Sequence, residues 1–392
     1  MTTWRRFARF DWVLFGAMLA LIAIGTVAIW SAGNARAEAV FHGMWRSNLV
    51  TALVGLGLYF AIALTDYRRL LDFLAIPAYL VSLVLLVAVL LVGDTIYGGS
   101  RWLWFFQPSE IAKLCVIAAL AFFLGDDRLL RGSVRRGFRG FLLAAALIGL
   151  PVALILAEPD QGTAITLVPS ALAMVFVAGT WRKGLVTLAA IGALAALVVL
   201  GAVYEAEKPG VSPERRARIL KCVPLRPHQL RRVRVFLFPE RDVTGAGYNL
   251  RQAQISIGSG GLTGKGIGKG ETNHLKYLPQ AISMNDFIFC VWAEETGFVG
   301  SIALLTLFGA LLLAGCRVAL VASDGRGRLL ALGVTTLVFA HVYVNIAMSI
   351  GLVPITGLPL QFISSGRTFL VMVLCGLGFV QSVSLHREEK QS

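Results

Sequence analysis

Ten long apolar runs, separated by polar segments, recur along the 392 residues of the chain. A helix needs about 17 to 25 apolar residues to cross a bilayer, and every run reaches that length. The pattern therefore predicts an all-α polytopic membrane protein with ten transmembrane helices, which we treat as a single membrane domain over residues 1–392. The predicted spans are residues 11–31, 47–64, 74–93, 109–125, 141–157, 162–179, 184–203, 284–315, 329–350 and 363–385.

Composition and charge agree with this class and orient the chain. Hydrophobic residues make up 57% of the sequence and charged residues only 15%, below the roughly 25% of a soluble domain. The net charge is +14, and most Lys and Arg residues of the short loops lie on the side that holds both termini. Because cytoplasmic loops carry the basic excess, we expect both termini in the cytoplasm. No nucleic-acid-binding module is visible, so we expect no nucleic acid partner.

One hydrophilic segment, residues 204–283, interrupts the alternation of spans and short loops. It follows the seventh span, so it forms a large extracytoplasmic loop. Its first half, to about Arg232, is polar and is predicted to be mobile. Its second half mixes glycines with regularly spaced apolar residues and is predicted to be ordered. Long loops in compact proteins are usually either functional or disordered.

The eighth span begins with SMNDFIFCVWAEETG, residues 283–297, which holds three carboxylates in an apolar setting. Ionisable groups near hydrocarbon are costly and are candidates for function. If the helix continues outward, Asp286 lies about 16 Å beyond the fully apolar part of the span, at headgroup depth on the outer face. Two interpretations of Asp286 stay open, a cap of the helix and a general base. Glu294 and Glu295 are predicted to be structural, with one of them paired with a basic residue on a neighbouring span.

Glycines and lysines concentrate in GYNLRQAQISIGSGGLTGKGIGKGETNHLKYLP, residues 247–279. Backbone N–H groups between successive glycines can close on an anion, and Lys265 and Lys269 would add charge. The segment is not a Walker A loop, because no Ser or Thr follows a Gly-Lys pair. A tightly turning loop and a site for a pyrophosphate or sugar ligand therefore both remain open.

A third polar stretch is GGSRWLWFFQPSEIAK, residues 98–113. Pro108 is typical of the first turn of a helix. Glu110 and Lys113 are three residues apart and can face each other on that helix. Lys113 lies early in an apolar span, so we expect it to face the protein interior.

A fourth polar stretch is AEPDQGTA, residues 157–164, a hairpin too short to leave the membrane interface. Its two carboxylates, Glu158 and Asp160, could bind a divalent cation or pair with Arg101. Asp160 could instead cap the following helix. The five histidines of the chain are scattered, so no site of His and Cys ligands is expected.

The last stretch is NIAMSIGLVPITGLPLQFISSGRTFL, residues 345–370, between the ninth and tenth spans. Its glycines and prolines interrupt the helical backbone. Such backbone at membrane depth is tolerated only inside protein or beside a cavity. Asn345 is polar within a span and is predicted to face inward.

These stretches, in this order, resemble the SEDS family (shape, elongation, division and sporulation) over nearly the whole chain. GAGYN with IGSGGLTGKG is more similar to the elongation branch than to the division branch. Asn285 departs from the usual Thr or Ser, and Gln361, Ser365 and Arg367 change a hairpin that usually reads LPFISYGGSS. The matching motifs are QPSE (107–110), EPD-GTA (158–164), the run from Arg232 to Gly266, DFIF (286–289), AEE-GF-G (293–300) and NI-M--GL-P-TGLPL (345–360).

The resemblance implies a peptidoglycan glycosyltransferase that joins lipid II units at the outer face of the bacterial cytoplasmic (inner) membrane and releases undecaprenyl pyrophosphate. It implies that Asp286 deprotonates the acceptor 4-hydroxyl and that the partner is a class B penicillin-binding protein, a transpeptidase. A lipid II flippase and a non-catalytic scaffold are the alternatives. A divalent cation, Mg²⁺ or Mn²⁺, stays open as a cofactor. The candidate substrate-binding residues are Glu110, Glu158, Asp160 and Asn249, together with Arg101, Lys113 and Lys265 for the donor pyrophosphate.

Overall fold

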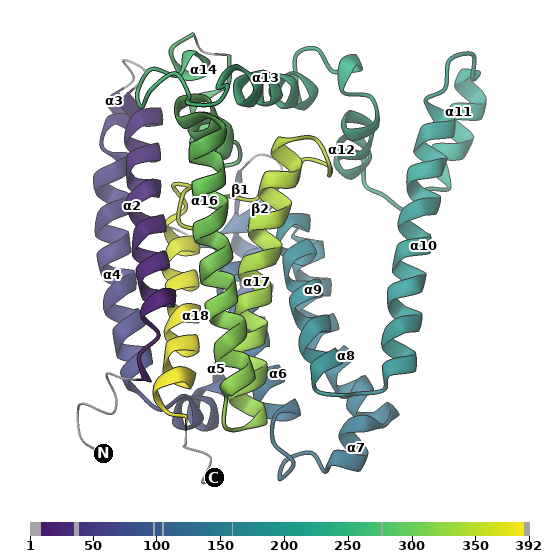
Figure 1. The fold of residues 1–392 in the computed structure, drawn as a ribbon. Helices are drawn as coiled ribbons and strands as arrows, with labels where there is room; N and C mark the ends of the chain where they lie inside the picture. Colours follow the sequence, from purple (N-terminus) through teal and green to yellow (C-terminus); the bar gives the residue numbers. More distant parts are fainter. Residues whose placement is uncertain are drawn as a thin grey trace.

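The computed structural model describes residues 9–34, 39–96, 99–103, 106–158, 160–275 and 277–387. Long helices run side by side along most of the molecule, and shorter elements cover one end of them (Figure 1). The long helices are α2 (Trp12–Asn34), α4 (Met44–Leu64), α5 (Tyr67–Val92), α6 (Pro108–Leu124), α8 (Phe138–Ala157), α9 (Gln161–Val177), α10 (Arg182–Ala206), α16 (Ile288–Val321), α17 (Gly325–Ser349) and α18 (Arg367–Leu385).

Each of the ten predicted spans coincides with one of these helices. Eight of them are long and apolar enough to cross a membrane, whereas α6 and α9 have 17 residues each. The prediction of an all-α polytopic membrane protein is therefore confirmed. A small antiparallel hairpin of β1 (Asp94–Ile96) and β2 (Gly99–Trp102) lies between α5 and α6.

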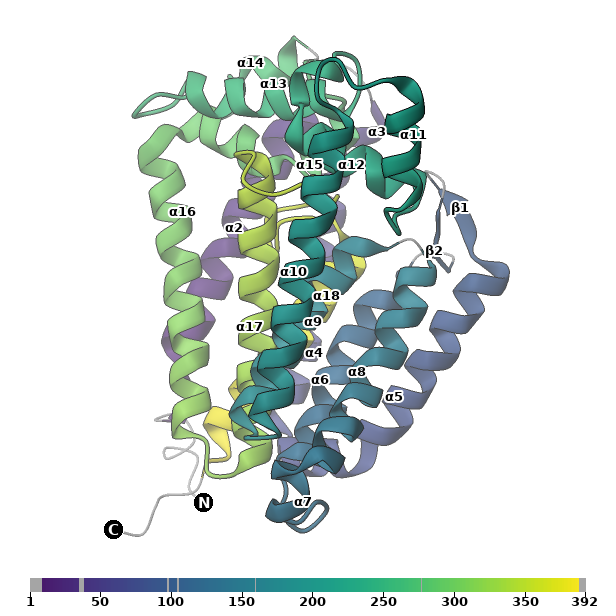
Figure 2. The same cartoon turned by 90° about the vertical axis from the view of Figure 1, so that its right-hand side faces the viewer.

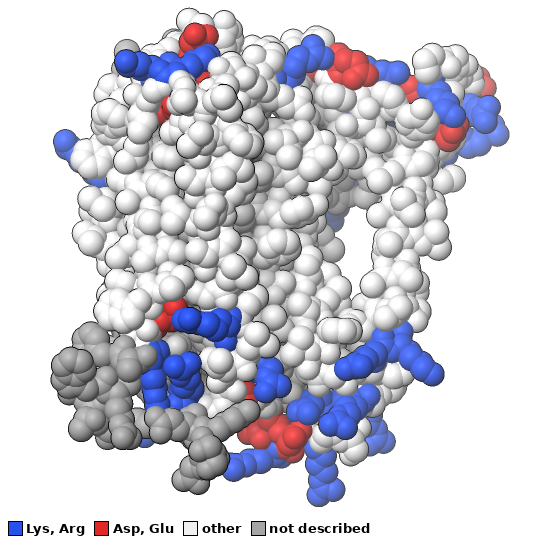
Figure 3. All heavy atoms as spheres, viewed as in Figure 1, with Lys and Arg blue, Asp and Glu red and all other residues white. Residues whose placement is uncertain are grey.

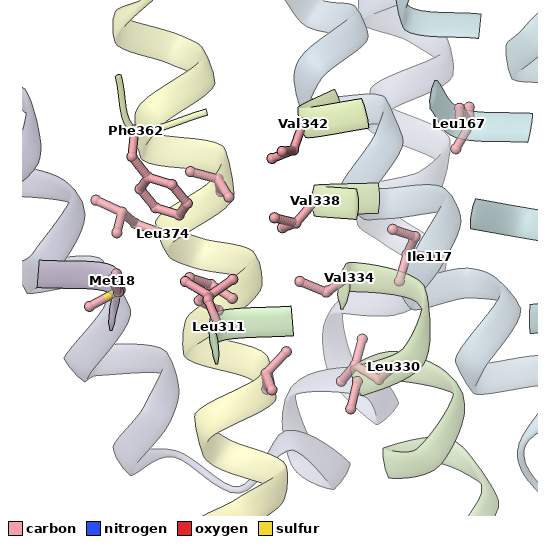
Figure 4. Packing of buried hydrophobic residues seen from close by; sticks show 14 of the residues in the cluster. Met18, Ile117, Leu167, Leu311, Leu330, Val334, Val338, Val342, Phe362 and Leu374 are labelled. Carbon is pink, nitrogen blue, oxygen red and sulfur yellow. The ribbon is translucent and has the colours of Figure 1, made fainter. Parts of the chain in front are cut away.

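Apolar side chains between the long helices form one large core. The helices α17 and α18 are mostly buried, whereas nearly all of α10 faces outward. In Figure 4, Phe362 of the segment between α17 and α18 lies beside Leu374, and Val334, Val338 and Val342 follow one side of α17. The core therefore fixes α17 and α18 firmly, together with the backbone that joins them.

The two ends of the described chain meet at the end of the bundle opposite the covering elements (Figure 1). The hydroxyl of Ser384 donates a hydrogen bond to the carbonyl oxygen of Arg9, at 2.7 Å. On the face shown in Figure 3, charged side chains lie near the two ends of the helices, and the surface between them is almost wholly uncharged. This distribution fits helices that cross a hydrocarbon layer.

The predicted extracytoplasmic loop is a layer of short helices over one end of the bundle (Figures 1 and 2). At the other end lies the short helix α7 (Gly132–Arg136), and α3 (Ala39–His42) lies between α2 and α4. The elements of the covering layer are α11 (Pro213–Lys221), α12 (Pro227–Leu237), the 3-10 helix η1 (Pro239–Arg241), α13 (Ala246–Ser259), α14 (Glu271–His274) and α15 (Gln280–Met284).

The first half of this layer is helical, which its polar composition did not indicate, and its mobility stays a prediction. Both α11 and α12 begin with a proline, and Ser212 caps α11 by accepting a hydrogen bond from the N–H of Arg215. The buried carboxylate of Glu207, at the end of α10, forms ion pairs with Arg216, Arg234 and Arg241. These ion pairs connect α10 to α11, α12 and η1.

Candidate functional site

Asp286 lies in a turn between α15 and α16, at the covered end of the bundle. The extrapolation of α16 outward through Asp286 was therefore wrong, because the helix begins at Ile288. The interpretation of Asp286 as the capping residue was also wrong, because Phe287 occupies the N-cap position of α16. The Asp286 side chain is half-buried, while Phe287 and Phe289 beside it are buried.

The turn that carries Asp286 is fixed by the broken segment between α17 and α18. The buried Asn345 donates from Nδ2 to the carbonyl oxygen of Asp286, at 2.9 Å, and to that of Leu358, at 2.6 Å. Ser364 donates to the carbonyl oxygen of Asn285 at 2.7 Å, and Ser365 donates to Asn285 Oδ1 at 2.5 Å. The prediction that Asn345 faces inward is confirmed, and its amide joins two segments that both lack regular helix bonds.

Gly357, in the segment between α17 and α18, lies beside both Asp286 and Arg232 of α12. A side-chain carbon placed at Gly357 would lie 3.6 Å from Asp286 Oδ2 and 4.0 Å from Nη2 of Arg232, on α12. Gly357 has a φ of +73° and is exposed, while Asp286 and Arg232 are half-buried. Arg232 Nη1 donates to the carbonyl oxygen of Thr356 at 3.0 Å. An accessible point is thus flanked by a carboxylate and a guanidinium.

Lys113 and Glu110 form a buried ion pair on α6, at 2.8 Å between Nζ and Oε1. Lys113 Nζ also lies 2.8 Å from Nε2 of His341, on α17, and 5.4 Å from the centre of the Phe369 ring. A cavity of about 20 Å³ beside these groups is also lined by Gln361. The predicted pairing and inward orientation of Lys113 are confirmed, whereas His341 was not anticipated.

Asp160 caps α9, which confirms one of the two predicted alternatives. Its carboxylate accepts hydrogen bonds from the backbone N–H and hydroxyl of Thr163, from Ser109 and from Gln107. Glu158, at the end of α8, is buried. Among the described residues, no group of three or more His, Cys, Asp or Glu side chains is placed to hold a metal ion. A divalent cation at this hairpin therefore stays a prediction.

The glycine-rich loop, residues 260–270, packs against a break in α16. At this break Gly297 has φ +68° and ψ −162°, a conformation that only glycine adopts readily. The N–H groups of Lys265 and Gly266 donate to the carbonyl oxygens of Glu294 and Glu295, at 3.0 and 2.9 Å. Beyond the break, two N–H groups of α16 donate to carbonyl oxygens of the loop in the same way. These N–H groups are used within the protein, which favours the interpretation as a tightly turning loop.

Lys265 adds ion pairs to this contact between the loop and α16. Its Nζ lies 2.9 Å from Glu294 Oε1 and 3.3 Å from Glu271 Oε2. Burial alone would lower the pKa of Lys265, but hydrogen bonds and charge from the two carboxylates outweigh burial, and the pKa is raised. The structural role of the glutamates agrees with the prediction, although the partner of Glu294 lies in the loop. Glu295 instead accepts a hydrogen bond from Ser31, on α2.

Two further candidates, Asn249 and Arg101, are not among the residues described around Asp286, Lys113 or Lys265. Asn249 is half-buried in α13, which packs against α16 through Leu250, Phe287 and Cys290. Arg101 belongs to β2, but its side chain lies outside the described residues, so its expected pairing with the carboxylates of the hairpin stays a prediction. The structure thus brings Asp286, Arg232 and Asn345 together, and it places Lys113 and Lys265 in two separate clusters, each with its own carboxylates.

Sequence comparison connects this arrangement to known proteins. The model of a family described as cell cycle protein, named for FtsW, RodA and SpoVE, matches residues 11–389. MrdB, a peptidoglycan glycosyltransferase of Escherichia coli K12, is 34% identical over 376 residues, which cover 95% of this chain and 92% of that protein. FtsW of Trichlorobacter lovleyi, a probable peptidoglycan glycosyltransferase, is 33% identical over 388 residues, covering 97% and 94%.

Solved structures share the fold. A structure from a study of how a peptidoglycan synthase complex coordinates polymerization and crosslinking superposes with a TM-score of 0.72 at 32% identity, covering 97% of this chain and 99% of that one. The crystal structure of the rod shape determining protein RodA of Thermus thermophilus gives a TM-score of 0.68 at 30% identity, covering 97% and 98%.

Proposed function

The chain belongs to the SEDS family and is most like its RodA members, and from this premise we propose that it is a peptidoglycan glycosyltransferase of cell elongation. Its substrate is lipid II, a disaccharide peptide linked to undecaprenyl pyrophosphate. The product is a growing glycan strand. The observation that carries the proposal is an accessible carboxylate, Asp286, fixed in a turn at one end of a membrane-spanning bundle.

Asp286 acts as the general base. The hydroxyl oxygen at C4 of the acceptor sugar attacks the anomeric carbon of the donor, and its proton passes to the Asp286 carboxylate. As the new glycosidic bond forms, the bond between the anomeric carbon and the pyrophosphate oxygen breaks, and the electron pair stays on the leaving pyrophosphate. A positioned base contributes roughly 10²- to 10⁴-fold to such a step. Hydrogen bonds from Asn345 and Ser364 to the backbone of residues 285 and 286 support this role, because they hold the carboxylate in place.

The reaction takes place at the outer face of the bacterial inner membrane. The basic residues of the short loops at the end opposite Asp286 support this orientation, with both termini in the cytoplasm. The covered end of the bundle then faces the substrate headgroups. We propose a class B penicillin-binding protein as the partner, supported by the likeness to a structure from a peptidoglycan synthase complex. It would crosslink the strands that this chain polymerises.

Purified protein, with its partner and fluorescent lipid II, tests the proposal. We expect long glycan strands from the wild type and none from Asp286→Ala. If neither protein makes strands while lipid II crosses sealed vesicles, the chain is a flippase and the proposal is wrong. Equal amounts of strands from both proteins would show that the chain is a polymerase but that Asp286 is not its general base.

A further inference from the structure

The carboxylate of Asp286 shares its accessible point with a cation. Gly357 has no side chain, and a carbon placed there would lie 3.6 Å from Asp286 Oδ2 and 4.0 Å from Arg232 Nη2. Gly357 is exposed, so this point is open to a ligand from outside. Any group seated against Gly357 therefore meets a base on one side and a guanidinium on the other.

The lysines that the sequence suggested for the pyrophosphate are engaged elsewhere. Lys113 has 2% of its side chain exposed and bonds to Glu110 and His341 inside the bundle. Lys265 is held by two carboxylates on the glycine-rich loop. Each lysine is therefore held in a cluster of its own, and neither is among the groups that lie beside Gly357.

Arg232 has the chemistry that an anionic leaving group requires. A guanidinium keeps its charge at every physiological pH and presents five N–H groups in a flat fork that matches phosphate oxygens. One of its nitrogens, Nη1, is fixed by the carbonyl oxygen of Thr356, which orients the fork. The helix that carries it is anchored two residues later, where Arg234 pairs with the buried Glu207 at 2.9 Å. Arg232 is thus held in place before any ligand arrives.

We propose that Arg232 binds the pyrophosphate of the donor lipid and stabilises the charge that develops there as the glycosidic bond forms. The inference rests on the proposed polymerase activity and adds a residue to its site. Asp286 takes the proton of the acceptor hydroxyl, and Arg232 faces the pyrophosphate oxygen that receives the electron pair from the breaking bond. Asp286 and Arg232, which flank Gly357, would therefore act on the attacking hydroxyl and on the leaving pyrophosphate of the same displacement reaction.

The test compares Arg232→Gln and Arg232→Lys with Arg231→Gln in the full-length protein with its partner. Arg231 is the control, because it is the neighbouring arginine on α12, its side chain is 67% exposed, and its contact with Asp242 is long, at 3.5 Å. Two quantities are measured, the rate of strand formation from fluorescent lipid II and the inhibition of that rate by added undecaprenyl pyrophosphate. Thermal unfolding in detergent checks that each variant is folded.

We expect Arg232→Gln to lose about 10- to 100-fold in rate and to need a correspondingly higher concentration of undecaprenyl pyrophosphate for inhibition. Arg232→Lys should recover part of both losses, and Arg231→Gln should match the wild type. A slower Arg232→Gln enzyme with unchanged inhibition would overturn the inference, because a merely structural role predicts that result. Wild-type rate and inhibition in Arg232→Gln would overturn it as well. If the wild type makes no strands, the proposed function itself is refuted.

Discussion

Removal of the buried charge of Lys113 tests whether the ion pair inside the bundle is structural. In Lys113→Met the carboxylate of Glu110, with only 7% of its side chain exposed, loses the ammonium 2.8 Å away. Breaking a buried pair on one side costs about 3 to 5 kcal/mol in the free energy of unfolding. At roughly 2.1 cal/mol/K per residue over 392 residues, this corresponds to a fall of about 4 to 6 °C in Tm. His341 loses its partner as well, which adds to the effect.

The assay is thermal unfolding in detergent of four proteins: the wild type, Lys113→Met, Glu110→Gln and the double variant. Because the double variant has no unpaired charge, we expect it to be more stable than Lys113→Met. Lys183→Met, at an exposed position at the start of α10, is the matched control and should stay within about 0.5 kcal/mol of the wild type. If the two single changes simply add, or if Lys113→Met unfolds at the wild-type temperature, the buried pair does not stabilise the bundle.

Three further predictions concern the neighbouring segments. Gly297→Ala should destabilise the protein by at least about 2 kcal/mol in thermal unfolding, because the backbone conformation at Gly297 is strained for other residues. Gly309→Ala in the same helix is the control and should be neutral or slightly stabilising, because a side-chain carbon placed there meets no atom within 4 Å. Asn345→Ala removes two hydrogen bonds of about 1 kcal/mol each and should slow strand formation, and a wild-type rate would show that the turn at Asp286 does not need them. The pKa of Lys265 is raised, so its contribution to stability is complete at neutral pH and is lost as the pH rises through the raised pKa of the folded state. Lys265→Met should remove this loss in a pH series of unfolding curves.

The membrane-spanning part of the fold could be predicted from the sequence because it depends on the length and apolarity of each segment alone. Local spacing was equally reliable for side chains. Glu110 and Lys113 are neighbours on any helix that contains both, and Asp160 precedes the first turn of α9 whatever surrounds it. These features follow from the geometry of single helices.

The surroundings of Asp286 could not be predicted, because they depend on contacts between distant segments. Asn345 reaches the carbonyl oxygen of a residue 59 positions away, and Arg232 comes from a helix in a loop that was expected to be mobile. The break in α16 at Gly297 could not be predicted either, because the loop that replaces its helix bonds lies earlier in the chain. Hydrophobic periodicity reports none of these contacts.

Two departures from the family pattern turn out to contact each other. Asn285 stands where Thr or Ser is usual, and Ser365 stands where the related hairpins carry Tyr. In the structure Ser365 donates to Asn285 Oδ1 at 2.5 Å, beside the backbone of Asp286. The two changes are therefore complementary, and they leave the support of the Asp286 turn in place.

The central claim is that the carboxylate of Asp286 removes a proton during glycan polymerisation. The most direct measurement is the initial rate of strand formation from lipid II by Asp286→Asn, relative to the wild type. The asparagine keeps the size of the side chain but cannot take the proton, and the variant must have the same Tm as the wild type. We expect a rate at least about 100-fold lower. A rate within threefold of the wild type would contradict it.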